Sequence, residues 1–158
     1  MTRKPYFPIF TDISEYKIIV VGGGKVAQRR VETLLQFAED ITVIAPVITE
    51  ELREFWKQKR IVWLEKSYAH EMDEMLKCAD MVLAATDDLQ CNEELVKVCR
   101  NYGVLVNTSH KKELCDFYFP AIVVKENAVA GVTASGINHM QAKCLREKIN
   151  DIMDKEMK

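Results

Sequence analysis

The sequence predicts an α/β protein in which a doubly wound parallel sheet is followed by a small β-hairpin and a helix. Three observations lead to this prediction. Apolar, β-branched runs alternate with helical patterns over roughly the first hundred residues, and strands that alternate with helices form parallel sheets with right-handed crossovers. A glycine-rich turn, Gly22-Gly23-Gly24, joins the first run to the first helical pattern. The alternation stops at about Asp116, where strand-like runs and a charged amphipathic helix follow.

The strands of the sheet are expected where short runs are rich in Ile, Val, Leu and Met. Their expected ranges are Lys17–Val21, Ile41–Ala45, Ile61–Glu65, Met81–Ala85 and Val104–Asn107. Between the strands, helices are expected at Val26–Phe37, from just after Thr49, within Ser67–Lys77 and at Gln90–Asn101. Thr49 is the expected N-cap of the second helix, and Asp87 and Asp88 are the capping candidates for the last.

The glycine turn has the form G-x-G-x-x-A, from Gly22 through Gly24 to Ala27, between a strand and a helix. This is the context that a dinucleotide-binding fingerprint requires. Gly22 permits the tight turn, Gly24 lets the backbone approach a pyrophosphate, and Ala27 lets helix and strand pack closely. Free N–H groups at the helix start would hold the phosphates. The turn therefore predicts a Rossmann-like, dinucleotide-binding domain, and the alternative is a glycine-rich turn without a ligand.

In such a sheet the ligand lies beyond the carboxyl ends of the strands. Four segments are therefore expected at one edge: Gly22–Lys25, Ala45–Val47, Thr86–Asp88 and Asn107–His110.

The part after Asp116 reads as a hairpin and a helix. Strand-like runs at Phe117–Val124 and Ala128–Thr133 flank a turn, and a helix is expected over Asn138–Met157. One hairpin and one helix make a poor independent core, so a homodimer is expected. The predicted domains are a dinucleotide-binding domain over 1–115, with the lead-in Pro5–Phe10 extended along its edge, and a dimerisation domain over 116–158.

Composition limits the classes of function. The chain has 158 residues with a net charge of −2, which indicates no general attraction to nucleic acid or to a membrane. No apolar run approaches the length that spans a bilayer, and none of the kind found in a signal peptide follows the N-terminus. The five cysteines are scattered without a C-x-x-C pair, which indicates reduced thiols in a cytoplasmic protein.

Several motifs together resemble the precorrin-2 dehydrogenase family, the sirohydrochlorin-forming enzymes of siroheme and cobalamin synthesis. The resemblance covers nearly the whole chain. The matching stretches are Y-F-P-I-F at Tyr6–Phe10, V-V-G-G-G-K-V-A-x-R-R from Val20, T-V-I-A-P at Thr42–Pro46, A-A-T-D-D at Ala84–Asp88, V-N-T-S at Val106–Ser109, F-Y-F-P-A at Phe117–Ala121 and L-R-E-K at Leu145–Lys148.

The resemblance implies NAD-dependent oxidation of precorrin-2 to sirohydrochlorin on a Rossmann domain joined to a dimerisation domain. It also implies that the cofactor touches Lys25 and Val26 after the glycines, and Pro46 and Val47 after the second strand. The choice of NAD comes from the family, because Ala45-Pro46 stands where an acidic residue usually binds the adenine ribose. With the four edge segments, the candidate cofactor-binding residues are Gly22, Gly23, Gly24, Lys25, Val26, Ala45, Pro46, Val47, Thr86, Asp87 and Asn107.

The chain departs from the family pattern at two positions. His110 stands where the family typically has an Asp credited with catalysis or chelation, and Ala134 replaces a serine near the substrate. Histidine accepts a proton near neutral pH, so His110 is the catalytic candidate, with Asp116 as a possible substitute nearby. The family usually carries a longer helical domain that helps to cover the tetrapyrrole. These departures leave a non-catalytic NAD- or tetrapyrrole-binding homologue as an alternative.

Two further expectations follow from the resemblance. Some family members also insert iron, so a bifunctional dehydrogenase and chelatase is a further alternative. No metal site is predicted, however, because the spacing of the candidate ligands His110, Cys115, Asp116 and His139 matches no known site. The carboxylates of precorrin-2 would bind basic side chains of the protein. For Arg29 and Arg30 the alternative is that they simply lie on a solvent-exposed helix face without binding substrate. The basic candidates are Lys25, Arg29, Arg30, Lys111, Lys112 and Lys143.

Overall fold

The computed structural model describes residues 4–156, which fall into two compact units. One unit runs from Thr11 to Tyr118. The other joins the described residues up to Phe10 to those from Phe119 onward. The sequence placed the boundary after residue 115 and assigned the lead-in Pro5–Phe10 to the first domain, so the observed units differ from the expected division at both places.

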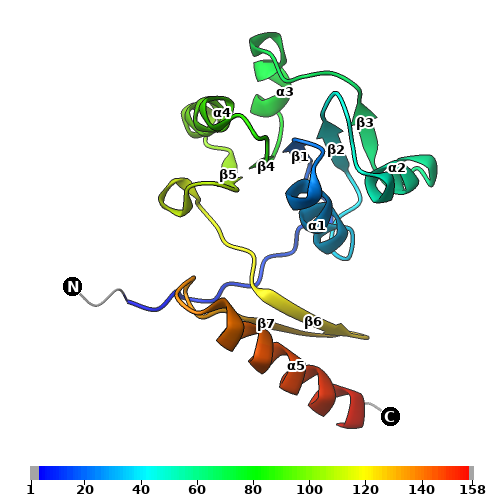
Figure 1. Cartoon of the computed structure of the whole chain (residues 1–158), viewed down its shortest axis with the longest axis vertical. Coiled ribbons are helices and arrows are strands. Elements are labelled where there is room, and N and C mark those ends of the chain that lie inside the picture. The colour runs from blue at the N-terminus through cyan, green and yellow to red at the C-terminus, as the bar shows by residue number, and fades with distance from the viewer. Residues whose placement is uncertain (1–3, 157–158) are drawn as a thin grey trace. The chain divides into compact units, whose positions relative to one another are not determined.

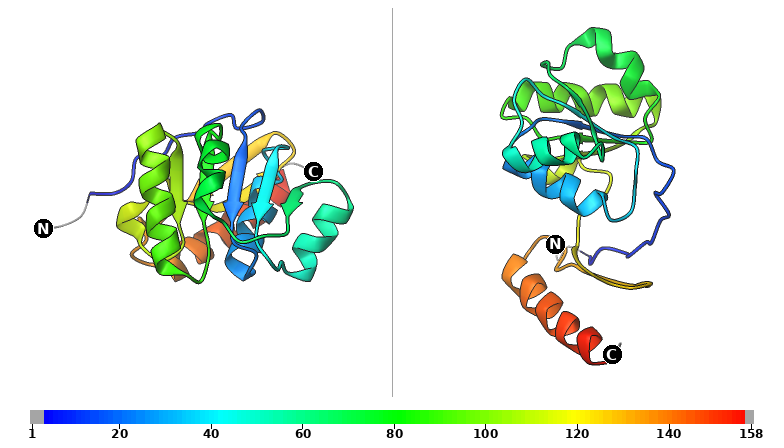
Figure 2. Two further views of the ribbon diagram at one scale, coloured as in Figure 1. Left: turned by 90° about the horizontal axis from the view of Figure 1, so that it is seen from above. Right: turned by 90° about the vertical axis from the view of Figure 1, so that its right-hand side faces the viewer.

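The larger unit is built on a five-stranded parallel sheet of order β3-β2-β1-β4-β5. Helices α1 and α2 cover one face of the sheet and α3 and α4 cover the other, which is the doubly wound arrangement that the sequence predicts (Figures 1 and 2). The strands are β1 (Ile18–Val21), β2 (Ile41–Ile44), β3 (Val62–Leu64), β4 (Met81–Ala84) and β5 (Leu105–Thr108). The helices are α1 (Lys25–Leu34), α2 (Glu50–Lys57), α3 (Asp73–Lys77), α4 (Leu89–Tyr102) and the short 3₁₀ turns η1 (His70–Met72) and η2 (Lys112–Leu114).

The central strands are buried on both faces. Every residue of β1, β2 and β4 is buried, which explains why these strands read as continuous apolar runs. One face of the sheet packs Ile19, Val21 and Val82 against Leu76 of α3 and Leu95 of α4. Burial of this apolar surface is the main favourable contribution to folding, and it holds the carboxyl ends of the strands in fixed register.

Two predicted helix caps are confirmed. The Thr49 side chain accepts a hydrogen bond from the Leu52 N–H (3.4 Å) at the start of α2. Asp88 Oδ1 accepts from the N–H groups of Gln90 (2.9 Å) and Cys91 (3.1 Å) at the start of α4. Such caps satisfy N–H groups that a helix leaves unpaired at its N-terminus.

The outer edge of β5 is covered by the chain segment that follows it. Val106 N–H donates to Asp116 Oδ2 (3.0 Å), and Asp116 N–H donates to the Val106 carbonyl (2.9 Å). Cys115 Sγ lies 3.3 Å from Thr108 N and 3.2 Å from Thr108 O. The segment therefore replaces a neighbouring strand and protects an edge that would otherwise be open to pairing. This is why residues 116–118 belong with the sheet and not with the second unit.

The smaller unit is a hairpin packed on one helix. Strands β6 (Ala121–Lys125) and β7 (Ala128–Val132) pair antiparallel, and α5 (His139–Glu156) packs against both. The first strand starts at Ala121, not at Phe117 as predicted, because Phe117 is tied to β5 by a bond from Asn107 Nδ2 to its carbonyl (2.8 Å). The predicted helix end, Met157, lies outside the described residues.

Among the described residues, no helix is both long enough and apolar enough to cross a membrane.

The Asp116 contact gives a test of the edge protection. Replacing Asp116 by Ala leaves the buried Val106 N–H without its acceptor, which costs about 1–3 kcal/mol of unfolding free energy. Urea unfolding followed by circular dichroism should show this loss, while Asp116→Asn, which keeps an oxygen acceptor, should recover much of it. Asp40→Ala, at an exposed carboxylate, is the control. Equal midpoints for D116A and D40A would show that the edge does not depend on Asp116.

Candidate functional site

A cavity of about 770 Å³ opens at the carboxyl ends of β1, β2 and β4. Its volume lies in the range of small-molecule and cofactor sites, and its position is the one that open α/β sheets use for ligands. The lining consists of residues 21–24, 44–49, 67–70 and 85–88, with Cys91 and Glu94 of α4.

The glycine turn forms the first wall of this cavity. Gly22 has φ +122°, and a Cβ there would lie 2.2 Å from the Ala85 carbonyl oxygen. A Cβ on Gly23 would lie 2.1 Å from the Val47 carbonyl oxygen. The loops after β4 and β2 therefore pack directly on glycine backbone, and no larger residue fits at either position.

Gly24 differs from the other two glycines. Apart from its chain neighbours, no described heavy atom lies within 4 Å of a Cβ built there, so the position faces open space. Gly24 is the N-cap of α1, and no described side chain caps this helix. The first N–H groups of α1 are thus oriented beside an open space with partial positive charge, which suits a pyrophosphate. Ala27 is fully buried against the sheet, as the fingerprint predicts.

The loop after β2 forms the second wall. Trp63 Nε1 donates to the Ala45 carbonyl (2.9 Å), and Thr49 N–H donates to the Gly23 carbonyl (3.0 Å). These bonds join the loop to β3 and to the glycine turn. Ala45, Pro46 and Val47 all line the cavity, and none of them carries a carboxylate that could bind an adenine ribose.

The loop after β4 forms the third wall, and both predicted residues, Thr86 and Asp87, line the cavity. Cys91, from the first turn of α4, also lines it. Burial, and secondarily the charge of Asp88, raise the pKa of the Cys91 thiol. The thiol therefore stays protonated at neutral pH and is a weak nucleophile.

The fourth wall is the loop from Ser67 to His70, which no sequence motif indicated. Tyr68 is held there because its hydroxyl donates to the Asp73 carboxylate of α3. Burial, and then this bond to Asp73, raise the pKa of Tyr68 well above its usual value. The residues belong to a loop after an edge strand without a recognisable motif, so only the strand order brings them to the cavity.

Four predicted site residues lie outside the cavity lining. Lys25 points toward α2, with Nζ 3.3 Å from Glu51 Oε1 and 3.2 Å from Gln28 Oε1, and Val26 is 39% exposed. Asn107 is buried in β5, where its amide holds the Phe117 carbonyl. The fourth residue is His110.

His110 lies just after β5, and its side chain is 16% exposed. Its Nδ1 lies 2.8 Å from Thr108 Oγ1, and its Nε2 lies 3.8 Å from Glu93 Oε1, beyond hydrogen-bond distance. Nε2 is covered from solvent and makes no hydrogen bond within residues 4–156. Lys111 donates to the same Glu93 carboxylate (3.1 Å), which lowers the pKa of Glu93.

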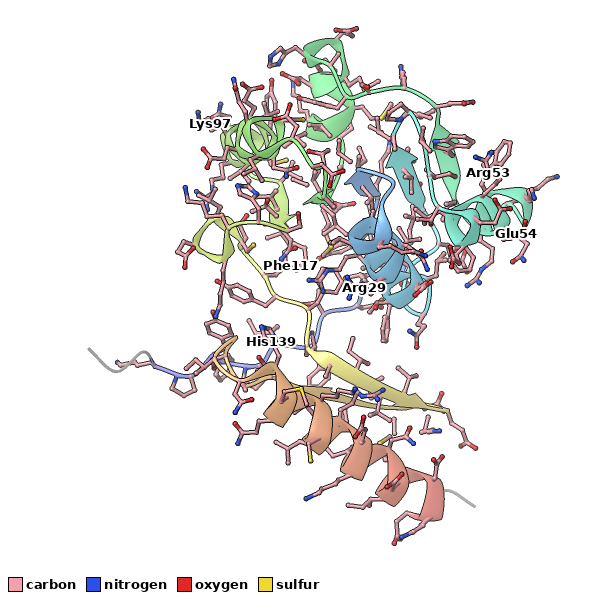
Figure 3. The ribbon with its side chains drawn as sticks, viewed as in Figure 1. Arg29, Arg53, Glu54, Lys97, Phe117 and His139 are labelled. Carbon is pink, nitrogen blue, oxygen red and sulfur yellow. The ribbon has the colours of Figure 1, made fainter. Side chains whose placement is uncertain are left out.

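Other candidates have contacts of their own. Asp116, the expected substitute for His110, holds the edge of β5 and lies 3.6 Å from Arg100 Nη2. Arg29 is exposed on α1 (Figure 3), whereas Arg30 is half-buried, and burial lowers its pKa. The solvated-face interpretation therefore applies to Arg29 and not to Arg30. Within the described residues, no group of three or more His, Cys, Asp or Glu side chains is arranged to hold a metal ion.

Comparison with known proteins identifies the family. A family model described as "Putative NAD(P)-binding" matches residues 9–121. The chain belongs to this NAD(P)-binding family. The match includes the glycine turn and all four walls of the cavity.

Relatives of this family member are siroheme proteins. The chain is 38% identical over 148 residues to the "Probable multifunctional siroheme biosynthesis protein HemA" of Ruminiclostridium josui, which aligns with 92% of this chain and 28% of that protein. It is 35% identical over 149 residues to siroheme synthase 1 of Serratia proteamaculans, covering 94% of this chain and 30% of that protein. The chain thus spans about three tenths of the length of these relatives.

A solved structure titled "SirC, precorrin-2 dehydrogenase" has the same fold. Its TM-score is 0.74 at 24% identity, over 92% of this chain and 70% of that one. Together with the curated relatives, the match confirms the resemblance indicated by the sequence motifs.

The glycine turn gives a matched pair of variants. Gly22→Ala places a methyl group against the Ala85 carbonyl at a strained φ, so its free energy of unfolding should fall by more than about 2 kcal/mol. Gly24→Ala adds the same methyl group toward open space, so it should change stability by less than about 1 kcal/mol. Denaturant unfolding of the two proteins measures the difference. Similar stabilities would contradict the close packing of Gly22.

Proposed function

We propose that this chain binds NAD and oxidises precorrin-2 to sirohydrochlorin. The observation that carries the proposal is the open cavity beside Gly24, inside a domain whose sequence aligns along nearly its whole length with siroheme proteins. Because the chain spans only part of these relatives, the activity is a proposal for the segment that aligns with them.

The cavity residues fit a dinucleotide in a defined direction. Gly22, Gly23, Gly24 and the start of α1 hold the pyrophosphate with backbone N–H groups. Ala45, Pro46 and Val47, together with the loop from Ser67 to His70, enclose the adenosine side, because β2 and β3 lie on that side of β1. Thr86 and Asp87 lie on the β4 side, toward the nicotinamide. Lys25, Val26 and Asn107 lie outside the lining, so their contact with the cofactor stays a prediction from the sequence.

The nicotinamide ring, when bound, supplies the hydride acceptor, and the protein supplies orientation and proton transfer. We assign the proton-accepting role to His110. Thr108 Oγ1 lies 2.8 Å from Nδ1, and in the tautomer whose Nδ1–H donates to this hydroxyl, Nε2 is the nitrogen that accepts a proton from the substrate. Glu93 lies close enough to stabilise the resulting imidazolium.

The first test is binding and turnover. Calorimetric titration should show that the protein binds NAD, with weaker binding of NADP. Addition of precorrin-2 with NAD should give sirohydrochlorin absorbance above a control without enzyme. Gly24→Ala should weaken NAD binding about tenfold or more, because its methyl group occupies the space of the phosphates. Binding without turnover would remove the catalytic proposal, and no binding would remove the proposal altogether.

The alternative is a protein that binds NAD or a tetrapyrrole without catalysis, and the histidine at the family's Asp position favours it. His110→Asp separates the two. If the wild type is inactive and H110D gains activity, the chain is a binding protein. If the wild type is active and His110→Ala lowers kcat while NAD affinity is unchanged, His110 acts in the chemical step.

We also propose that the smaller unit forms a homodimer. Within its described residues only Val123, Ser135 and Ala142 are buried, so the hairpin and α5 form little core of their own. Large apolar side chains stay exposed on the same unit: Phe7, Ile9, Phe10, Val129, Ile137, Met140, Leu145 and Ile152. Apolar surface of this kind marks an interface, and a second copy of the chain is the partner that the family resemblance indicates.

The cysteines bear on localisation. All five are free thiols, which supports a reducing, cytoplasmic setting.

The dimer is tested by sedimentation. The wild-type protein should sediment as a dimer at micromolar concentration. Leu145→Glu and Ile152→Glu together place charges on the exposed side of α5, so they should shift the protein toward a monomer that still binds NAD. Lys148→Glu, a polar change on the same helix, is the control. A monomeric wild type would refute the proposal.

A further inference from the structure

Asn92 is a fully buried polar residue that no sequence motif singled out. It lies on α4 and faces the loop after β4. Its Nδ2 donates to the Thr86 carbonyl (2.9 Å), and its Oδ1 accepts from Thr86 N–H (3.1 Å) and lies 2.8 Å from Thr86 Oγ1. One side chain therefore satisfies both backbone groups of Thr86, as a neighbouring strand would.

The backbone held in this way is the one that packs on the glycine turn. Ala85 N–H donates to the Val21 carbonyl (2.8 Å). A Cβ built on Gly22 would lie 2.2 Å from the Ala85 carbonyl oxygen and 3.1 Å from the Thr86 nitrogen. β4 ends at Ala84, so the strand ladder does not fix Thr86. The same loop lines the cavity through Thr86 and Asp87.

The chemistry of Asn92 indicates more than space filling. A buried amide side chain costs free energy unless it is hydrogen-bonded, so an apolar residue would serve if the position only needed to be filled. An apolar residue would leave the Thr86 N–H and carbonyl without these partners. Thr86 Oγ1 also lies 2.9 Å from the Asp88 carbonyl, which extends the network to the cap of α4.

We infer that Asn92 is a positioning residue for the nucleotide site: it fixes the Thr86 peptide against the glycine turn, so that the β4 wall is already in the geometry that a bound NAD requires. The inference rests on the proposed function, because NAD is the ligand whose site it shapes. Preorganisation of a wall lowers the cost of binding, so loss of the clamp weakens affinity for NAD.

The test compares two Asn→Asp changes on one helix. N92D keeps the shape of the side chain and loses the Nδ2 donor to the Thr86 carbonyl. N101D makes the same change at an exposed position nine residues further along α4, on the opposite face. At pH 8, N92D should raise the Kd and KM for NAD about tenfold or more, with less than about a threefold change in kcat. N101D should stay within about twofold of the wild type.

The pH dependence separates positioning from stability. Burial raises the pKa of the carboxyl group that N92D introduces, and its protonated form regains a donor for the Thr86 carbonyl. The affinity of N92D for NAD should therefore improve as the pH falls from 8 to 6, relative to the wild type and N101D. Circular dichroism at each pH confirms that the proteins compared are folded.

Three results are decisive against the inference. A folded N92D with wild-type affinity overturns it, and so does a lower melting temperature with unchanged Kd, which would mark Asn92 as a purely structural residue. An affinity loss that does not respond to pH also overturns it. If the wild type itself binds neither NAD nor NADP, the proposed function fails first and this inference fails with it.

Discussion

The site depends on the contact of backbone with backbone at the glycine turn. The loops after β2 and β4 approach Gly23 and Gly22 so closely that the carbonyls of Val47 and Ala85 occupy the places of missing side chains. This contact brings three strand ends together around one cavity. A Cβ on Gly24, by contrast, would face open space. Two of the three glycines are thus needed for the packing of the protein on itself, and the third leaves the space in which we propose that a phosphate binds.

The surrounding polar contacts keep these loops in place. Trp63 holds the Ala45 carbonyl from β3, Thr49 bonds to Gly23, and Asn92 holds Thr86 from α4. Each bond satisfies a backbone group where regular strand pairing has ended, so the loops have little freedom to lose when a ligand binds. The side opposite these loops, near β5, is arranged differently. There Asn107 and Asp116 tie β5 to the segment that follows it, and the Nε2 of His110 makes no hydrogen bond within residues 4–156.

The smaller unit follows different physics. Its hairpin and helix satisfy their hydrogen bonds locally but bury very few side chains. A unit of this kind is completed by surface from elsewhere, whereas the sheet unit has a core of its own. A dimer of the kind we propose would bury the exposed apolar side chains of α5 and of the lead-in, residues 5–10, and so supply the core that the smaller unit lacks.

The sequence by itself determined the parallel sheet, the glycine turn, the caps at Thr49 and Asp88, and the family. These features are local, because apolar runs, glycine spacing and capping residues act within a few positions of the chain. The tertiary structure decided which residues reach the cavity. Tyr68 and Cys91 line the cavity because the strand order brings the loop after β3 and the start of α4 to the same edge of the sheet. Lys25 and Asn107 contact other partners instead. It also moved the boundary past Asp116, since the hydrogen bonds of an edge strand are satisfied by whichever segment folds back on it.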